Sequence, residues 1–212
     1  MIGIIEKVIV DCLLEVGDDE LRQDVFFDAG IPPDRVYRMD EHYPDSETSK
    51  LISSALSVTK LEPQQFFDLF SYIFFNVVQD VFPEFLRMSA SSEDLVRKQA
   101  KIHALIAAGS RKPGESQKST DKFELEDRGP HDIVVRYKSD LQLCGLYETL
   151  VRHAAERYGD TVEIAAHECA HDGAEACTIA VKWTAIAGTP THLNTVTAPG
   201  LDRASDRGVA NG

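Results

Sequence analysis

Apolar and polar residues follow a helical period along the first half of the chain. Apolar positions three and four residues apart predict helices over residues 2–16, 18–29 and 45–60. Residues 64–85 are apolar on nearly every side and hold seven of the ten phenylalanines, so we expect a helix that is buried on most of its surface. A last amphipathic pattern over 91–108 completes a predicted helical half.

The pattern changes after this helix. Residues 109–122 are polar, rich in Gly, Ser, Pro and Lys, and predict a loop. Beyond it, FELED and DIVVRYKS are typical of strands, and LCGLYETLVRHAAERYG is typical of a helix. VEIAAHECA and ACTIAVKWTAI predict a strand pair joined at Asp172-Gly173. The predicted fold class is therefore α+β, with an N-terminal helical subdomain followed by a mostly antiparallel sheet that carries a packed helix.

These elements predict one domain and a tail. We expect the domain to cover residues 1–187, with a helical part over 1–108, the polar loop, and an α/β part over 123–187. Residues 188–212 show no periodicity and are expected to form a flexible tail.

Composition narrows the classes of partner. The net charge of −13, from 22 basic and 35 acidic residues, argues against nucleic acid and anionic membranes, because both bind basic surfaces. No segment reaches the roughly 18 apolar residues of a membrane span. The N-terminus lacks the basic region and the cleavage site of a signal peptide. We therefore expect a cytoplasmic protein with reduced cysteines.

Three side chains suggest a ligand site. His103 lies among apolar positions of its helix and is either a core histidine bonded to a carbonyl or an axial iron ligand. Tyr137 and Ser139 alternate on a predicted strand, so they either offer two hydroxyls to an anion or form a partly exposed strand end. Spacing alone leaves these alternatives open.

The stretch HECAHDGAEAC concentrates two cysteines and two histidines in eleven positions. On a strand, His167, Cys169 and His171 would emerge on one face, and the following turn would return Cys177 beside them. A metal-free cysteine pair, a Cys169–Cys177 disulfide and a zinc site are the three interpretations. Oxidation of zinc thiolates to a disulfide would release the metal, so the last two can be states of one redox device.

Taken in order along the chain, these motifs make the sequence similar to the heme–nitric oxide/oxygen binding family (H-NOX), the sensor fold also used by soluble guanylate cyclase. The likeness runs from Met1 to about Ile186. MIGII matches the opening of the family, PDRV its first inter-helix turn, and FFDLFSYIFF its Phe-rich helix. Tyr137-x-Ser139 resembles the start of its Tyr-x-Ser-x-Arg clamp. LCGLYETL and CAHDGAEAC resemble the zinc-bearing segments of a bacterial subgroup.

The resemblance implies a heme b held by His103, with Tyr137 and Ser139 bonded to its propionates. Two positions depart from the family pattern. Leu141 stands where the clamp has Arg, and the polar loop offers only Pro113 near the place where the family presses a proline on the porphyrin.

The distal pocket implied by the resemblance is apolar. Its residues are Ile9, Phe74 and Leu146, although Tyr147 adjoins the last of them. A stable O₂ complex needs a hydrogen-bond donor over the bound oxygen, whereas an NO complex does not. The pocket is therefore expected to favour NO over O₂.

The resemblance also implies a zinc site in the C-terminal hairpin. Its ligands would be Cys144, His167, Cys169 and Cys177, with His171 as the alternative to His167. The family histidine lies three places before the first hairpin cysteine, whereas His167 lies two places before it. Either a bulge restores His167 or His171 replaces it. Four protein ligands leave no open position, so no catalysis is expected there.

The expected function is a heme-based gas sensor, not an enzyme, that responds to nitric oxide and signals to a separate effector protein. By resemblance, the effector is a histidine kinase or a cyclic-nucleotide signalling enzyme. The signal would arise when NO weakens the iron–His103 bond and releases the helix over 91–107. A heme-free zinc/thiol redox sensor on the same fold is the alternative, and Leu141 and the polar loop favour it.

Overall fold

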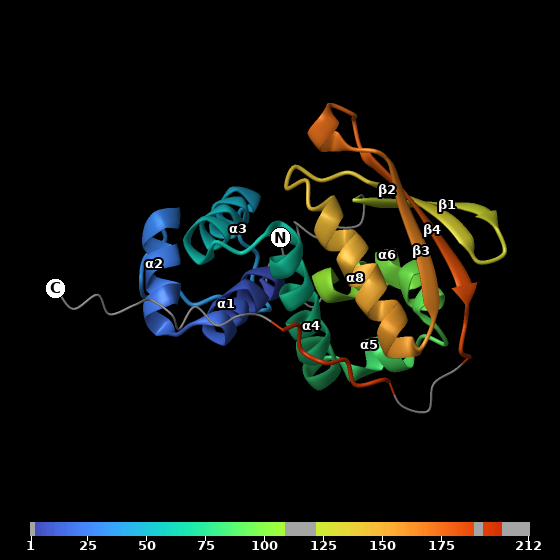
Figure 1. The fold of residues 1–212 in the computed structure, drawn as a ribbon, viewed down its shortest axis with the longest axis horizontal. Helices are drawn as coiled ribbons and strands as arrows, with labels where there is room; N and C mark the ends of the chain where they lie inside the picture. Colours follow the sequence, from blue (N-terminus) through green and yellow to red (C-terminus); the bar gives the residue numbers. More distant parts are fainter. Residues whose placement is uncertain (1–2, 109–121, 189–192, 201–212) are drawn as a thin grey trace.

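The computed structural model describes residues 3–108, 122–188 and 193–200, and it places a group of helices beside a sheet crossed by one helix (Figure 1). The helices are α1 (Ile4–Val16), α2 (Asp19–Ala29), α3 (Asp45–Thr59), α4 (Pro63–Val81), α5 (Pro83–Arg87), α6 (Ser92–Ala108) and α8 (Cys144–Tyr158). The strands are β1 (Phe123–Gly129), β2 (Asp132–Tyr137), β3 (Thr161–Glu168) and β4 (Cys177–Ala185). The α+β class and the order of its elements are confirmed.

Local sequence signals explain where the helices begin and end. The Asp18 side chain accepts hydrogen bonds from the backbone N–H groups of Glu20 and Leu21 at the start of α2. That helix ends at Gly30, whose φ of 66° is left-handed and favours glycine. Helix α4 starts with Pro63 after a reciprocal cap between Glu62 and Gln65.

The sheet has the strand order β1-β2-β4-β3, and each neighbouring pair is antiparallel. Helix α8 lies across one face of it (Figure 1). Their contact forms a core whose buried residues are Val96, Ile133, Val135, Tyr147, Val151, Ile179, Val181 and Trp183. Burial of one face explains the alternating pattern of β4, whereas Ile133, Val134 and Val135 of β2 are all buried.

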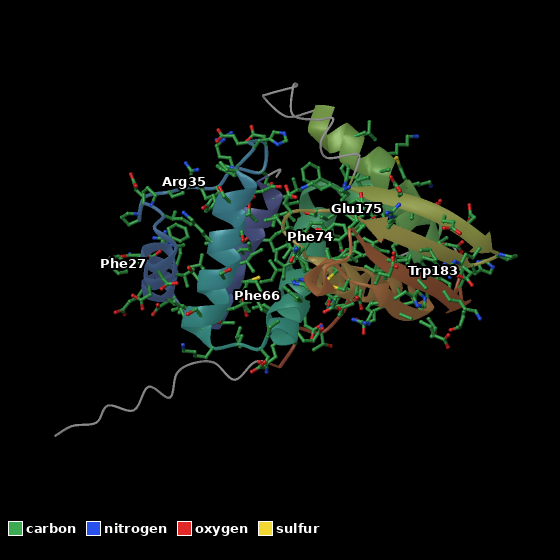
Figure 2. The ribbon with its side chains drawn as sticks, turned by 90° about the horizontal axis from the view of Figure 1, so that it is seen from above. Phe27, Arg35, Phe66, Phe74, Glu175 and Trp183 are labelled. Carbon is green, nitrogen blue, oxygen red and sulfur yellow. The ribbon has the colours of Figure 1, made fainter. Side chains whose placement is uncertain are left out.

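A second core fills the helical part. It is built mainly from α1, α2, α3 and α4, and Leu146 of α8 reaches into it. Cys12 is fully buried there, as its apolar helix face predicts. In Figure 2, Phe66 and Phe74 of α4 lie toward the middle of the molecule, whereas Phe27 and Trp183 lie near opposite ends. Helix α4 therefore packs toward both halves.

Part of the predicted tail is described and lies against the helices. The Asn194 backbone N–H donates to the Arg157 carbonyl at 2.7 Å, and Leu193 packs against the helical core. The predicted boundary between domain and tail stays a prediction, and most of the polar loop (109–121) lies outside the described residues. Among the described helices, none is long and apolar enough to cross a membrane.

Candidate functional site

Helix α6 carries His103 and is fixed to the sheet at its first turn. The backbone N–H and the hydroxyl of Ser92 both donate to Asp160 Oδ2, at 2.8 and 2.6 Å. Nε1 of Trp183 in β4 donates to the same hydroxyl at 2.8 Å. All three residues are buried. Because the carboxylate accepts an N–H that a helix start leaves unpaired, this network anchors α6.

The imidazole of His103 lies beside aromatic rings. His103 is half-buried, and its ring centroid lies 5.3 Å from that of Phe123 in an edge-to-face arrangement. Phe123 in turn stacks on Tyr137 at 5.1 Å and lies 5.3 Å from Tyr147 of α8. The rings of Phe123, Tyr137 and Tyr147 therefore form an aromatic cluster beside the imidazole.

Tyr137 and Ser139 come together at the end of β2. The Tyr137 hydroxyl lies close to the Ser139 side chain and to the backbone of Leu143. Burial raises the pKa of Tyr137, and the nearby thiols of Cys144 and Cys177 add to the rise. The phenol therefore stays protonated and can donate to an anion. Strand β2 ends at Tyr137, so Ser139 lies beyond the strand, at the start of a turn in which the Gln142 N–H donates to the Ser139 carbonyl at 3.0 Å.

The three residues of the expected distal pocket share the helical core. Ile9 is fully buried, Leu146 is 4% exposed, and Phe74 packs against the same cluster. Phe74 also stacks on Phe70, with ring centroids 6.0 Å apart. The neighbouring Tyr147 belongs to the sheet core instead.

The hydroxyl of Tyr147 faces α6. It donates to Gln99 Oε1 at 3.2 Å, and burial raises the pKa of this phenol well above its ordinary range. Gln99 precedes His103 by one turn of α6. The Tyr147 hydroxyl therefore points from α8 to the part of α6 that carries His103.

The donor set fits a heme b. It combines one half-buried imidazole, which suits iron, with two adjacent hydroxyls that suit carboxylates, next to aromatic and aliphatic side chains. Leu141 adds no charge to this set, and its backbone N–H donates to the Ser139 hydroxyl at 3.3 Å. These residues would therefore offer only neutral groups to a heme propionate.

Three cysteines form a second site. Sγ of Cys169 lies 3.7 Å from Sγ of Cys144 and 3.9 Å from Sγ of Cys177, and all three sulfurs lie within 4.8 Å of one another. Tetrahedral zinc with Zn–S bonds of about 2.3 Å sets sulfurs about 3.8 Å apart. Burial raises the pKa of the Cys144 thiol to about 12, and Cys177 and Cys169 add to it. A bound cation would favour the thiolate form and so offset the free-energy cost of ionising this thiol.

The two candidate histidines lie differently. The β3–β4 register shifts between Ala166 and Glu168, so His167 is the extra residue of a bulge. His171 Nε2 lies 2.8 Å from the Gln142 carbonyl oxygen. Neither imidazole joins the group of three sulfurs in the described part of the chain.

The hairpin differs from the expected tight turn. Strand β3 ends at Glu168, and residues Ala170–Asp172 form a 3₁₀ turn before Gly173, whose φ is 92°. The expectation that His167, Cys169 and His171 share one strand face is therefore wrong. The turn makes its own backbone bonds, such as Asp172 N–H to the Cys169 carbonyl at 3.0 Å, and these end the strand ladder.

A family model described as "Haem-NO-binding" matches residues 2–166, which is most of the chain. The chain belongs to the H-NOX family. Members of this family are heme-based gas sensors rather than enzymes. No curated protein matches the sequence.

Solved H-NOX structures share the fold. An H-NOX protein from Shewanella oneidensis in the Fe(II)NO state is 21% identical, has a TM-score of 0.72, and the match covers 87% of this chain and 99% of that chain. A single-residue variant from K. algicida in the Fe(II) unliganded state is 17% identical, with a TM-score of 0.71 and coverage of 87% and 97%. A variant from T. tengcongensis is 13% identical, with a TM-score of 0.67 and coverage of 88% and 100%.

Sequence reasoning missed several residues that shape this H-NOX fold. Asp160 anchors α6, and its only sequence signal is that it follows a helix-ending glycine. Glu175 was not singled out, yet its carboxylate lies 2.6 Å from Lys138 Nζ. Both partners are close only in the folded chain, so no local pattern indicates either contact.

Proposed function

We propose that this H-NOX chain binds heme b through His103 and senses nitric oxide, with Tyr137 and Ser139 bonded to the propionates. Family membership supports a heme, and the donor set supports these assignments. A bound heme would supply the iron that takes the gas as a ligand. His103 is the one imidazole that α6 offers, and α6 is firmly anchored at its start.

The preference for NO is carried by one observation. The residues of the proposed distal pocket are apolar. Tyr147, which follows Leu146 in the chain, has a hydroxyl, but this hydroxyl donates to Gln99 of α6. A bound O₂ would lack the donor that stabilises it, whereas NO needs none. Ile9, Phe74 and Leu146 therefore exclude water and provide bulk without a proton donor.

Contacts of α6 provide a route for the signal. The Tyr147 hydroxyl of α8 donates to Gln99 in the middle of α6. Arg97 of α6 forms ion pairs with Glu93 on the same helix and with Asp127 on β1. A displacement of His103 would therefore move α6 against both α8 and the edge strand β1. We propose that the signal passes to a separate effector protein in the cytoplasm. That effector would be a histidine kinase or a cyclic-nucleotide signalling enzyme.

We also propose that the chain belongs to the zinc-containing bacterial subgroup. Cys144, Cys169 and Cys177 would supply three thiolates, and the sulfur spacing supports zinc. His167, which lies in the bulge, would be the fourth ligand, and His171 is the alternative.

The test is an absorption spectrum of the ferrous protein with and without NO, with zinc measured in the same sample. A Soret band that shifts with NO and one zinc per chain are expected. His103→Ala should abolish the NO-dependent shift, whereas His131→Ala, an exposed histidine, should retain it. A normal heme spectrum and NO response in His103→Ala would refute the axial assignment. Zinc without any Soret band would favour the heme-free zinc/thiol sensor.

A further inference from the structure

The segment 137–143 connects β2 to α8 and carries both hydroxyls proposed for the heme. It lies directly against the cysteine cluster. Tyr137 is the cross-strand partner of Cys177 in the β2–β4 ladder. At its other end, the backbone of Leu143 lies close to the Tyr137 hydroxyl, and Cys144 follows Leu143 in the chain. The two ends of the segment therefore both adjoin a cluster sulfur.

The hairpin that holds Cys169 also touches this segment. The Gln142 carbonyl oxygen lies 2.8 Å from His171 Nε2 and 3.9 Å from Cys144 Sγ. Glu175 lies 2.6 Å from Lys138 Nζ, and Figure 2 shows Glu175 toward the middle of the molecule rather than at the far end of the sheet. The Lys138–Glu175 pair is exposed, so it contributes little by itself.

A metal bound by the three cysteines would strengthen the connection between the hairpin and the segment 137–143. The three sulfurs come from the start of α8, from the residue after β3 and from the start of β4. Strands β3 and β4 are already paired in the sheet, and β4 is paired with β2. Metal–thiolate bonds would add links from this hairpin to the start of α8, beside the Gln142–His171 hydrogen bond and the exposed Lys138–Glu175 ion pair.

We propose that a metal on Cys144, Cys169 and Cys177 acts as a latch on the segment 137–143, and so holds Tyr137 and Ser139 in position for the heme propionates. The inference rests on the proposed heme and zinc sites, and it assigns the zinc a role in heme retention. The latch matters more here because Leu141 leaves the clamp without a guanidinium.

The first test needs no heme. Amide hydrogen exchange of the full-length apoprotein is measured with zinc and with a chelator. Zinc should slow exchange in residues 137–143 about tenfold, a size usual for coupling between sites, and leave α2 unchanged. Cys144→Ser should show no response to zinc, and the half-exposed Cys169→Ser repeats the test at a second ligand. Unchanged exchange in 137–143 while zinc binds the wild type would overturn the latch.

The second test measures heme retention as the rate of heme transfer to excess apomyoglobin. Removing zinc should speed transfer from the wild type about tenfold and should not change transfer from Cys144→Ser, which is already fast. Glu175→Gln should speed transfer only slightly, and the matched exposed variant Glu163→Gln not at all. Equal transfer rates with and without zinc would overturn the latch. If the protein takes up no heme, the proposed function fails, while hydrogen exchange still decides whether the metal holds the segment.

Discussion

Glu6 is a carboxyl group in an apolar core. It is fully buried on α1 among the helical-core residues, and the Thr48 hydroxyl is hydrogen-bonded to its Oε1. Its Oε2 has no hydrogen-bond partner among the described residues. Burial raises the pKa of Glu6 from 4.5 to about 7, because the low dielectric disfavours the charged form. The folded chain therefore keeps a proton at a pH where the unfolded chain has lost it.

This single residue should make stability depend on pH. Since the folded pKa is raised, the full contribution of Glu6 is present below pH 4.5 and is lost as the pH rises through about 7. The loss amounts to about 3 kcal/mol in the free energy of unfolding. Urea unfolding at several pH values between 5 and 8 should show this fall in the wild type and a flatter profile in Glu6→Gln. The exposed Glu15→Gln serves as the control on the same helix. Parallel profiles for wild type and Glu6→Gln would contradict the assignment.

At the scale of elements, α6 depends on a residue that lies far away in sequence. Asp160 follows α8 and accepts from Ser92 at the start of α6, and its other oxygen accepts from the backbone N–H of Ala187 at 3.0 Å. One carboxylate thus joins the start of α6, the end of α8 and the chain after β4. The helix that carries His103 is held where these three elements meet.

Replacing this carboxylate should loosen α6. Asp160→Ala removes the acceptor from a buried helix start, which should lower the free energy of unfolding by about 2 kcal/mol. Asp160→Asn keeps one acceptor oxygen and should cost less. The fluorescence of the one tryptophan, Trp183, reports directly on this junction, because its Nε1 donates to Ser92. Wild-type stability and fluorescence in Asp160→Ala would show that the contact does not hold the helix.

At the scale of the whole molecule, a seam between α4 and α8 joins the two cores. Arg157 is only 3% exposed and donates from α8 to Asn76 Oδ1 at 2.6 Å and to Gln79 Oε1 at 3.2 Å. Its guanidinium also lies 5.6 Å from the centre of the Phe75 ring. Burial lowers the pKa of Arg157, and among the described residues its guanidinium donates to two neutral amides and to the Tyr72 carbonyl. Polar side chains therefore connect the helical part to the α/β part.

Loss of this guanidinium should weaken the seam. Arg157→Ala leaves two amide acceptors unpaired and opens a cavity, which should lower the free energy of unfolding by about 3 kcal/mol. Arg152→Ala, one helical turn and one residue earlier, removes only an exposed pair with Glu148 and should cost less than about 0.5 kcal/mol. Equal effects of the two variants in urea unfolding would show that the seam is not held by Arg157.

Periodicity and local chemistry determined the elements of this chain. The helical spacing in α1 to α4, the Phe-rich sequence of α4 and the alternation in β4 predict the α+β fold without any contact being known. The order of the motifs along the chain also indicated the family, whose model matches residues 2–166. These signals are local, because each depends on residues within one or two turns of helix or strand.

Only the tertiary structure decided how the candidate sites are built. Packing between elements directs the Tyr147 hydroxyl to Gln99. It also pairs Tyr137 with Cys177 and places His167 in a bulge. A hairpin signal at Asp172-Gly173 could not show that a 3₁₀ turn removes His171 from the strand. The physical reason is that side-chain direction at an element's end is set by competing long-range contacts, which no local period encodes.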